Sequence, residues 1–238
     1  MNDATTYRQR SPLPFIVGGG FVVLFITAGF WQLDRRGEKL ELEAAFANAA
    51  GYTSYASGNE LRPFERIEVR GRYLEERQII LDNMIVGGRV GHFILTPLET
   101  GGDEPLVIVN RGFIPMSEAG ISQADIAVAP PSREVRGRVG RLPRPGYRMG
   151  AAIPEVTSWP VHAVYPVYED LAITLGREVH PFVLLLDADE PNGWIREWQP
   201  DGVGPGRHLA YAVQWFAMAL VLSGLLLMHA RKRSFDND

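Results

Sequence analysis

The chain has 238 residues, of which 46% are hydrophobic, a formal net charge of −4 and no cysteine. Its length fits one ordinary domain with accessory segments. The absence of cysteine excludes disulfide bonds, thiol catalysis, thiolate metal sites and covalent c-type haem attachment.

The first predicted element is an uncharged, apolar run from Phe15 to Leu33. An α-helix of this length covers about 30 Å, which is the thickness of the hydrocarbon core of a bilayer. The run is too long for the apolar part of a signal peptide and ends in Trp31-Gln32, which favours a retained helix over a cleaved leader. A second such run lies near the other terminus. The sequence therefore predicts two transmembrane helices, at residues 15–33 and 208–228.

Two spans would place both termini on one side of the membrane and residues 34–207 on the other. The tail Arg231-Lys232-Arg233 follows the second span directly, and positive charge is normally held in the cytoplasm. We therefore expect residues 1–14 and 229–238 to be cytoplasmic and the domain of residues 34–207 to be periplasmic. Too few residues precede the first span for a mitochondrial transit peptide, so a bacterial inner membrane is the expected location.

Between the spans, the hydrophobic pattern changes from helical to strand-like. Residues 38–50 have apolar side chains at helical spacing, which predicts a short helix near the membrane. A second short helix is predicted at residues 166–176, which end in glycine. Strands are predicted at residues 65–73, 78–86, 90–98, 105–115, 133–142 and 182–189. The expected fold is an α+β membrane protein with a mainly antiparallel, partly open barrel-like sheet and a few short helices.

Two features of this region have two interpretations each. The pentapeptide EVRGR occurs at residues 68–72 and 134–138, and it marks either two similar halves of a barrel or a chance match in an arginine-rich chain. A basic cluster of six arginines would contact lipid headgroups or an acidic partner, or would cover solvated strand faces, which is the simpler interpretation. The cluster consists of Arg133, Arg136, Arg138, Arg141, Arg144 and Arg148.

The sequence signatures of the common enzyme classes are absent, including GxSxG, HExxH and the Walker A loop. His92, His162 and His180 lack metal-ligand spacing, so we interpret them as surface or core residues. Asp187 and Asp189 are interpreted as part of a solvated turn at a strand end. The chain is therefore expected not to be an enzyme. Nucleic acid is excluded as an expected partner, because acids outnumber bases between the spans and this region lies outside the cytoplasm.

Polar and aromatic residues gather at the outer ends of both spans. This span-end set consists of Trp31, Gln32, Arg35, Arg207, His208, Tyr211, Gln214 and Trp215. On a helix, His208, Tyr211 and Trp215 share one stripe. Antiparallel packing of the spans through their small residues would bring both ends to the same depth. The aromatic residues form either an interfacial belt or a ligand site. A neutral imidazole here can ligate a haem iron, with arginines available for the propionates.

Five motifs follow one another in order along the chain. They are GxWQLxRxxxK at 29–39, GRY at 71–73, GxxxxTPL at 91–98, VNRGFIP at 109–115 and HxxYAxQWF at 208–216. Together they resemble the surfeit-locus-one family of cytochrome c oxidase assembly factors. The resemblance implies two spans, a large outer domain and transient binding of haem a, which is supplied to the oxidase catalytic subunit. It also implies haem a synthase as a partner, in addition to membrane lipid.

The resemblance also assigns residues. It implies that His208 is an axial ligand of the haem iron, surrounded by Tyr211, Gln214, Trp215, Trp31, Gln32 and Arg35. Arg207 is not part of the resemblance, and we expect it near a propionate only because it lies next to His208 in the sequence. It implies that Asn110, Arg111 and Gly112 form a strand-end motif, which we interpret as structural. The alternative function is a membrane scaffold that stabilises oxidase assembly intermediates without binding haem. Oxidases that use cytochrome c and those that use quinol both fit the resemblance.

Overall fold

A computed structural model of the chain describes residues 12–49, 51–56, 58, 60–116, 121–122, 124–129, 132–143, 152–153, 156, 158–200 and 204–235. The chain forms two compact units. The helical unit comprises Met1–Ala45 and Pro200–Asp238, and the sheet unit comprises Phe46–Gln199.

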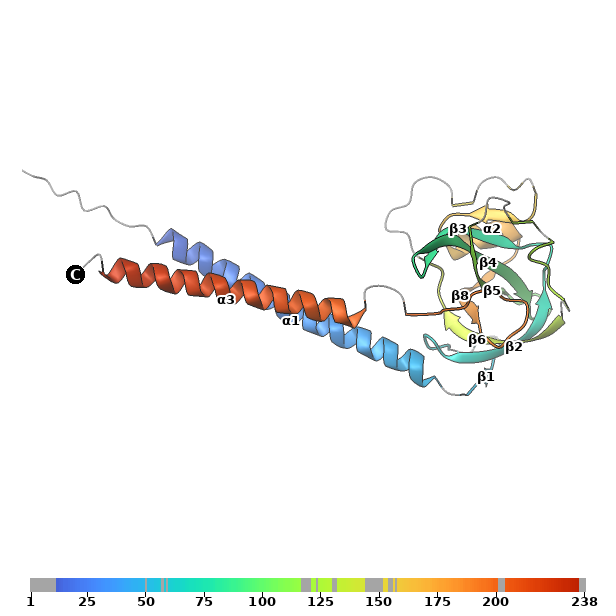
Figure 1. Cartoon of the computed structure of the whole chain (residues 1–238). Coiled ribbons are helices and arrows are strands. Elements are labelled where there is room, and N and C mark those ends of the chain that lie inside the picture. Colours follow the sequence, from blue (N-terminus) through green and yellow to red (C-terminus); the bar gives the residue numbers. More distant parts are fainter. Residues whose placement is uncertain are drawn as a thin grey trace, which may run out of the picture. The chain divides into compact units, whose positions relative to one another are not determined.

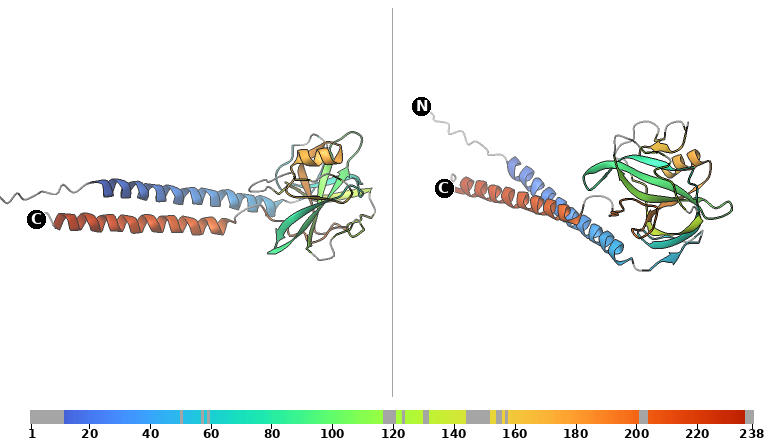
Figure 2. Two further views of the ribbon diagram at one scale, coloured as in Figure 1. Left: turned by 90° about the horizontal axis from the view of Figure 1, so that it is seen from above. Right: turned by 45° about the vertical axis from the view of Figure 1, so that its right-hand side comes forward.

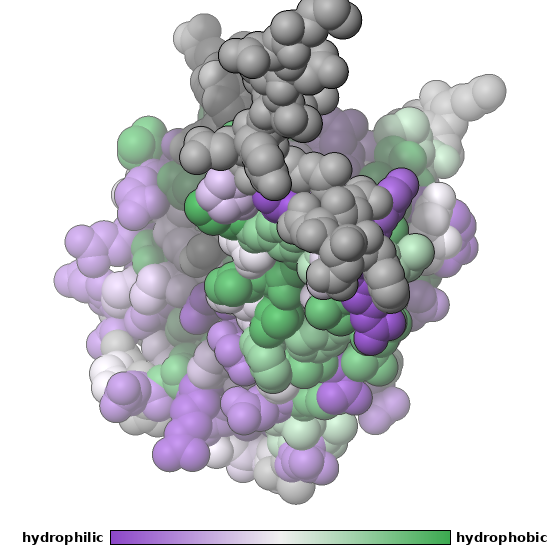
Figure 3. Space-filling view, turned by 90° about the vertical axis from the view of Figure 1, so that its left-hand side faces the viewer, coloured by the Kyte–Doolittle hydropathy of each residue, from purple (hydrophilic) through white to green (hydrophobic). Residues whose placement is uncertain are grey.

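The helical unit contains α1 (Leu13–Asn48) and α3 (Pro205–Phe235), which run side by side (Figure 1 and Figure 2). Both helices are long and apolar enough to cross a membrane, and only 11% of the residues in each apolar window are buried. A core helix of a soluble protein would bury most of these residues, whereas a membrane helix exposes them to lipid. Figure 3 shows how hydrophobic residues gather on the surface of this unit.

The predicted separation between a first span and a short helix at residues 38–50 is wrong, because α1 is continuous through this region. Residues after Gln32 are mostly charged residues and leucine, which have high helix propensity, and none is proline. An ion pair between Arg35 and Glu38, with 2.5 Å between Nη1 and Oε2, lies along the helix surface at this point. The helix therefore extends past the apolar segment as a charged extension.

The two helices contact each other through a stripe of buried and partly buried residues, here called the facing stripe. Its members recur at alternating intervals of three and four residues, the pattern of coiled-coil packing. They are Phe15, Gly18, Val22, Phe25, Gly29, Gln32 and Arg36 on α1, and His208, Ala212, Trp215, Ala219, Leu222 and Leu226 on α3. A Cβ at Gly29 would lie 2.5 Å from Cε1 of Phe216, so the helices approach closely there.

The sheet unit is built on one mixed sheet. Its strands are β1 (Thr53–Ser54), β2 (Arg66–Tyr73), β3 (Ile79–Val86), β4 (Arg89–Glu99), β5 (Leu106–Pro115), β6 (Ser132–Gly140), β7 (Val161–Ala163) and β8 (Val179–Leu186), with helix α2 (Tyr168–Leu175) before β8. The strand order is β1-β2-β6-β8-β5-β4-β3-β7, and β2 also pairs with β4. Strands β2, β6, β8, β5 and β4 therefore close into a ring (Figure 1). This confirms the predicted barrel-like sheet.

Five of the pairings between the described strands are antiparallel and three are parallel. Each predicted strand and the helix α2 occur in the structure, with shifted ends. For example, the last predicted strand begins earlier, at Val179, and ends at Leu186. Strands β1 and β7 were not predicted, because two or three residues are too few to show alternation.

The two copies of EVRGR lie on β2 and β6, which pair antiparallel. In this register Glu68 lies opposite Arg136, and Arg70 lies opposite Glu134. Nη2 of Arg70 is 2.9 Å from Oε2 of Glu134. The repeated sequence therefore complements itself in charge when its two copies run in opposite directions. It marks two neighbouring strands rather than two halves of a barrel.

The core divides between the two faces of the sheet. On β5, Val107 and Val109 belong to a cluster with residues from all the other ring strands, which fills the ring. Leu106 and Ile108 point to the opposite face and pack in a second cluster with Leu171 of α2. All five side chains are fully buried. The first four residues of strand β5, 106–109, are therefore all apolar rather than alternating with polar residues.

Candidate functional site

A hydrogen bond between His208 and Gln32 joins the span-end residues of the two helices. Nδ1 of His208 lies 2.7 Å from Oε1 of Gln32, and Gln32 is only 9% exposed. Because an amide oxygen can only accept, the imidazole donates through Nδ1, and in the neutral tautomer with this proton the lone pair lies on Nε2. An imidazole that is oriented in this way through one nitrogen is prepared to bind a metal through the other.

The remaining members of the span-end set divide into two groups. Trp215 lies on the facing stripe, with its ring centroid 5.7 Å from that of Phe25. Tyr211 is 50% exposed and Trp31 is 53% exposed, so both lie away from the helix contact. The position in the contact that was expected for Tyr211 is taken by Ala212, which is buried. The structure therefore brings together Gln32, His208 and Trp215, but not Tyr211.

The other polar members of the span-end set are exposed. Gln214 and Arg207 both lie on the outer surface of α3. The guanidinium of Arg35 lies over the ring of Trp31, 5.8 Å from its centroid, and pairs with Glu38. Arg35 therefore already has two partners and lies on the side of α1, outside the facing stripe. It is Arg36, which the sequence interpretation left out of the set, that lies on the facing stripe.

An apolar groove runs along one side of the helix pair, within the segments that are long enough to cross a membrane. Its volume is about 490 Å³, and it is lined by Ile26 of α1 and by residues of α3 between Phe216 and Leu227. Phe216 lies about two helical turns from His208. The groove therefore begins about 12 Å along the helix from His208 and continues through the apolar part of the helices.

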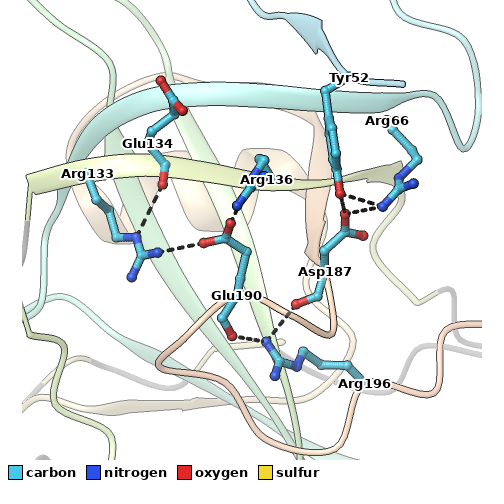
Figure 4. A network of polar contacts seen from close by, with 8 residues as sticks. All are labelled: Tyr52, Arg66, Arg133, Glu134, Arg136, Asp187, Glu190 and Arg196. Carbon is cyan, nitrogen blue, oxygen red and sulfur yellow. Dashed lines mark hydrogen bonds and ion pairs between the residues drawn. The ribbon is translucent and has the colours of Figure 1, made fainter. Parts of the chain in front are cut away.

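The sheet unit contains an acid–arginine network that the sequence interpretation missed (Figure 4). Asp187 accepts hydrogen bonds from the hydroxyl of Tyr52 and from Nη2 of Arg66, the latter over 2.9 Å. Asp187 is 8% exposed, so its assignment to a solvated turn is wrong. Burial, followed by the hydrogen bond to Asp187, raises the pKa of Tyr52. The neighbouring carbonyls of residues 187, 188 and 190 all accept from Arg196, which fixes this loop.

The same network explains part of the basic cluster. Glu190 is 4% exposed and pairs with Arg133, over 2.6 Å, and with Arg136, over 2.9 Å. These two arginines therefore bind a buried carboxylate within the sheet unit, and Arg133 does not lie on a solvated strand face. Arg144 and Arg148 lie outside the described residues. The sequence position of Glu190, four residues after β8, gave no indication of this pairing, because the contact depends on the β6–β8 register.

Arg111 of the VNRGFIP motif is buried in the sheet unit, with 1% of its surface exposed. It donates to five neutral acceptors and lies 4.7 Å from the centroid of the Trp194 ring. The acceptors are the carbonyls of Asn192, Ile126 and Ala127, Oε1 of Gln78 and Oγ1 of Thr96. Burial lowers the pKa of Arg111 to about 10. The motif is therefore structural: it ties strand β5 to two loops.

His92 and His162 lie on either side of Asp82. Nδ1 of His92 is 2.6 Å from Oδ1 of Asp82, and Nδ1 of His162 is 2.9 Å from its Oδ2. Among the described residues, no group of three or more histidine and carboxylate side chains is arranged to hold a metal ion. The two histidines are thus part of a surface hydrogen-bond cluster, whose members are too far apart in the sequence to be linked by a motif.

Comparisons with known proteins place the chain in a family. The chain matches the SURF1 family over residues 20–220. It is 24% identical over 220 residues to a SURF1-like protein of Rickettsia felis, an alignment that covers 87% of this chain and 92% of that protein. It is 21% identical over 227 residues to a SURF1-like protein of Monosiga brevicollis, which covers 86% and 82% respectively. The chain belongs to the SURF1 family, which is associated with the assembly of cytochrome oxidase.

Proposed function

We propose that this protein holds haem a transiently at His208 and passes it to the catalytic subunit of a haem-copper oxidase. It receives this cargo from haem a synthase and performs no chemical reaction on it, so it is an assembly factor and not an enzyme. Both termini lie in the bacterial cytoplasm, the two helices cross the inner membrane through lipid, and the sheet unit lies in the periplasm.

The observation that carries this proposal is the hydrogen bond between Nδ1 of His208 and Gln32. A buried amide in the contact between two apolar helices is costly unless it is paired. Here the pairing orients an imidazole and leaves its Nε2 with a lone pair. A purely structural role would require only the hydrogen bond between the two side chains.

The residues around His208 suit haem a in three ways. The imidazole supplies a nitrogen ligand for the iron. The apolar groove that begins near Phe216 suits the farnesyl tail, which belongs in a lipid-like environment. Exposed members of the span-end set, Trp31, Tyr211, Gln214 and Arg207, lie where the outer side of the haem or the receiving subunit would be contacted. A single protein ligand and an open side allow the cargo to be released.

The test is to purify the full chain from cells that make haem a and to record its visible spectrum. We expect His208→Ala to lose most of the bound haem. His229→Ala is the matched control, because His229 lies near the opposite end of α3 beside Phe15. It should keep the haem content of the unsubstituted chain. Unchanged haem content in His208→Ala would reject the ligand assignment.

The second candidate function is a scaffold that holds oxidase subunits without binding haem. The exposure of Trp31 and Tyr211, at 53% and 50%, favours it, because aromatic side chains on the outside of a helix pair suit contact with another membrane protein. The purified chain would then lack haem but would still co-purify with oxidase subunits. The spectrum and the co-purification together distinguish the two functions.

A further inference from the structure

Arg36 has an unusual position for a charged residue. It lies on the facing stripe of α1, one turn beyond Gln32, and it is partly buried, whereas its neighbours Asp34 and Arg35 are exposed. Among the residues that the structure describes, Arg36 makes no ion pair or hydrogen bond with another side chain. The guanidinium of Arg36 therefore keeps its N–H donors available for an anionic group that is brought to this end of the helix pair.

The helix register places Arg36 near His208, one turn beyond the Gln32 side chain to which His208 is hydrogen-bonded. Phe15 contacts His229, and Gly29 lies against Phe216, so each step forward along α1 is matched by a step backward along α3. Two turns beyond Gly29 lies Arg36, and two turns before Phe216 lies His208. The hydrogen bond from His208 to Gln32 fixes this end of the register.

We infer that Arg36 binds a propionate carboxylate of the haem whose iron is bound by His208, which makes the site a two-point clamp. This inference rests on the proposed function. An arginine presents paired N–H donors that match the two oxygens of a carboxylate. Arg35 suits this role less well, because it is paired with Glu38 and stacked on Trp31. Arg207, which was expected near a propionate, lies exposed on the outer surface of α3. Arg36 therefore sets the orientation of the macrocycle, while His208 holds its metal.

The experiment measures haem release from the purified full chain, in detergent, to an excess of a haem-accepting protein. The variants are Arg36→Gln and, as matched control, Arg35→Gln, each loaded with haemin or with haemin dimethyl ester, in which both carboxylates are blocked. Loss of a hydrogen-bonded carboxylate contact should speed haemin release from Arg36→Gln roughly ten- to hundredfold. Arg35→Gln should change the rate by no more than about threefold, because exposed ion pairs contribute little. The dimethyl ester should leave Arg36→Gln and the unsubstituted chain at the same rate.

A conservative variant controls for folding. Arg36→Lys keeps the charge but loses the paired donors, so its haemin release rate should fall between those of Arg36→Gln and the unsubstituted chain. Helix content by circular dichroism should be equal in all variants. If His208→Ala loses haem but Arg36→Gln releases haemin like the unsubstituted chain, the inference about Arg36 is wrong and the proposed function stands. If His208→Ala keeps its haem, the proposed function fails, and the inference fails with it.

Discussion

Replacing Arg111 with lysine tests the network that holds the sheet unit together. Lysine keeps the buried positive charge, so the cost of taking that charge out of water stays. It has three donors on one nitrogen, whereas Arg111 donates to five acceptors and stacks its planar group on Trp194. At least two of these acceptors therefore lose their donor.

The expected loss of stability follows from the acceptors that no longer have a donor. The carbonyls of Asn192 and Ala127 accept from Nε and Nη2, whereas Gln78 accepts from Nη1, and one ammonium group cannot reach all three acceptors. A buried acceptor left without a donor costs about 1–3 kcal/mol, and these two carbonyls are only partly buried, so we expect Arg111→Lys to lower the free energy of unfolding by about 2 kcal/mol. That is a large part of the total for a domain, which is about 5–15 kcal/mol.

The assay is urea unfolding of the full chain in mild detergent, followed by tryptophan fluorescence. With a typical urea dependence of about 1–3 kcal/mol per molar, the midpoint should fall by about 1–2 M. Arg70→Lys is the matched control, because the Arg70 side chain is 84% exposed and its ion pair with Glu134 should contribute less than about 1 kcal/mol. Equal midpoints for the two variants would refute the view that the Arg111 network stabilises the domain.

Two further predictions concern stability against pH and the packing of the helices. A hydrogen bond from Arg72 and a weaker effect from Arg177 lower the pKa of Glu99 in the folded state. The stabilisation that these bonds give is therefore fully present above the unfolded-state pKa of about 4.3. It is lost as the pH falls through the lower folded-state pKa. Glu99→Gln should therefore unfold about 1 kcal/mol more easily at pH 7, and its difference from the unsubstituted chain should disappear in acid unfolding curves; a difference that persists there contradicts this assignment. Gly29→Val should push the helices apart at Phe216, whereas Gly20→Val, whose Cβ would meet nothing within 4 Å, should not. Spin labels on cysteines introduced one per helix, in a chain with none of its own, would measure this, and equal separations in both variants would contradict it.

The predicted spans and strands came from local patterns, and the structure confirms most of them for that reason. The two uncharged apolar runs form parts of α1 and α3, and most of the alternating segment ERIEVRGRY forms β2. The ring closure was only partly predictable, because the pairing of Arg72 with Glu99 and of Tyr73 with Leu98 joins strands that no hairpin connects. Strand β7 pairs with β3 in parallel through three residues, which leave no periodic pattern.

The site was harder to predict than the fold, because helical periodicity alone gives more than one stripe. From His208, steps of three or four residues lead to Tyr211 or to Ala212, and both steps continue to Trp215. The helices approach closely, so the small residue takes the contact and the bulky one lies outside. Arg35 rather than Arg36 was included in the span-end set for the same reason. The position of one residue on a helix face depends on its partner helix.

The axial ligand swap His208→Met tests the central claim most directly. The account predicts that the purified, haem-loaded variant differs from the unsubstituted chain in its visible spectrum, and that the reduction potential of its haem is higher when methionine binds the iron. Gln32→Leu, which removes only the hydrogen bond to Nδ1, should broaden the spectrum without this change of ligand. A His208→Met variant whose haem has the same spectrum and the same reduction potential as that of the unsubstituted chain would contradict the account.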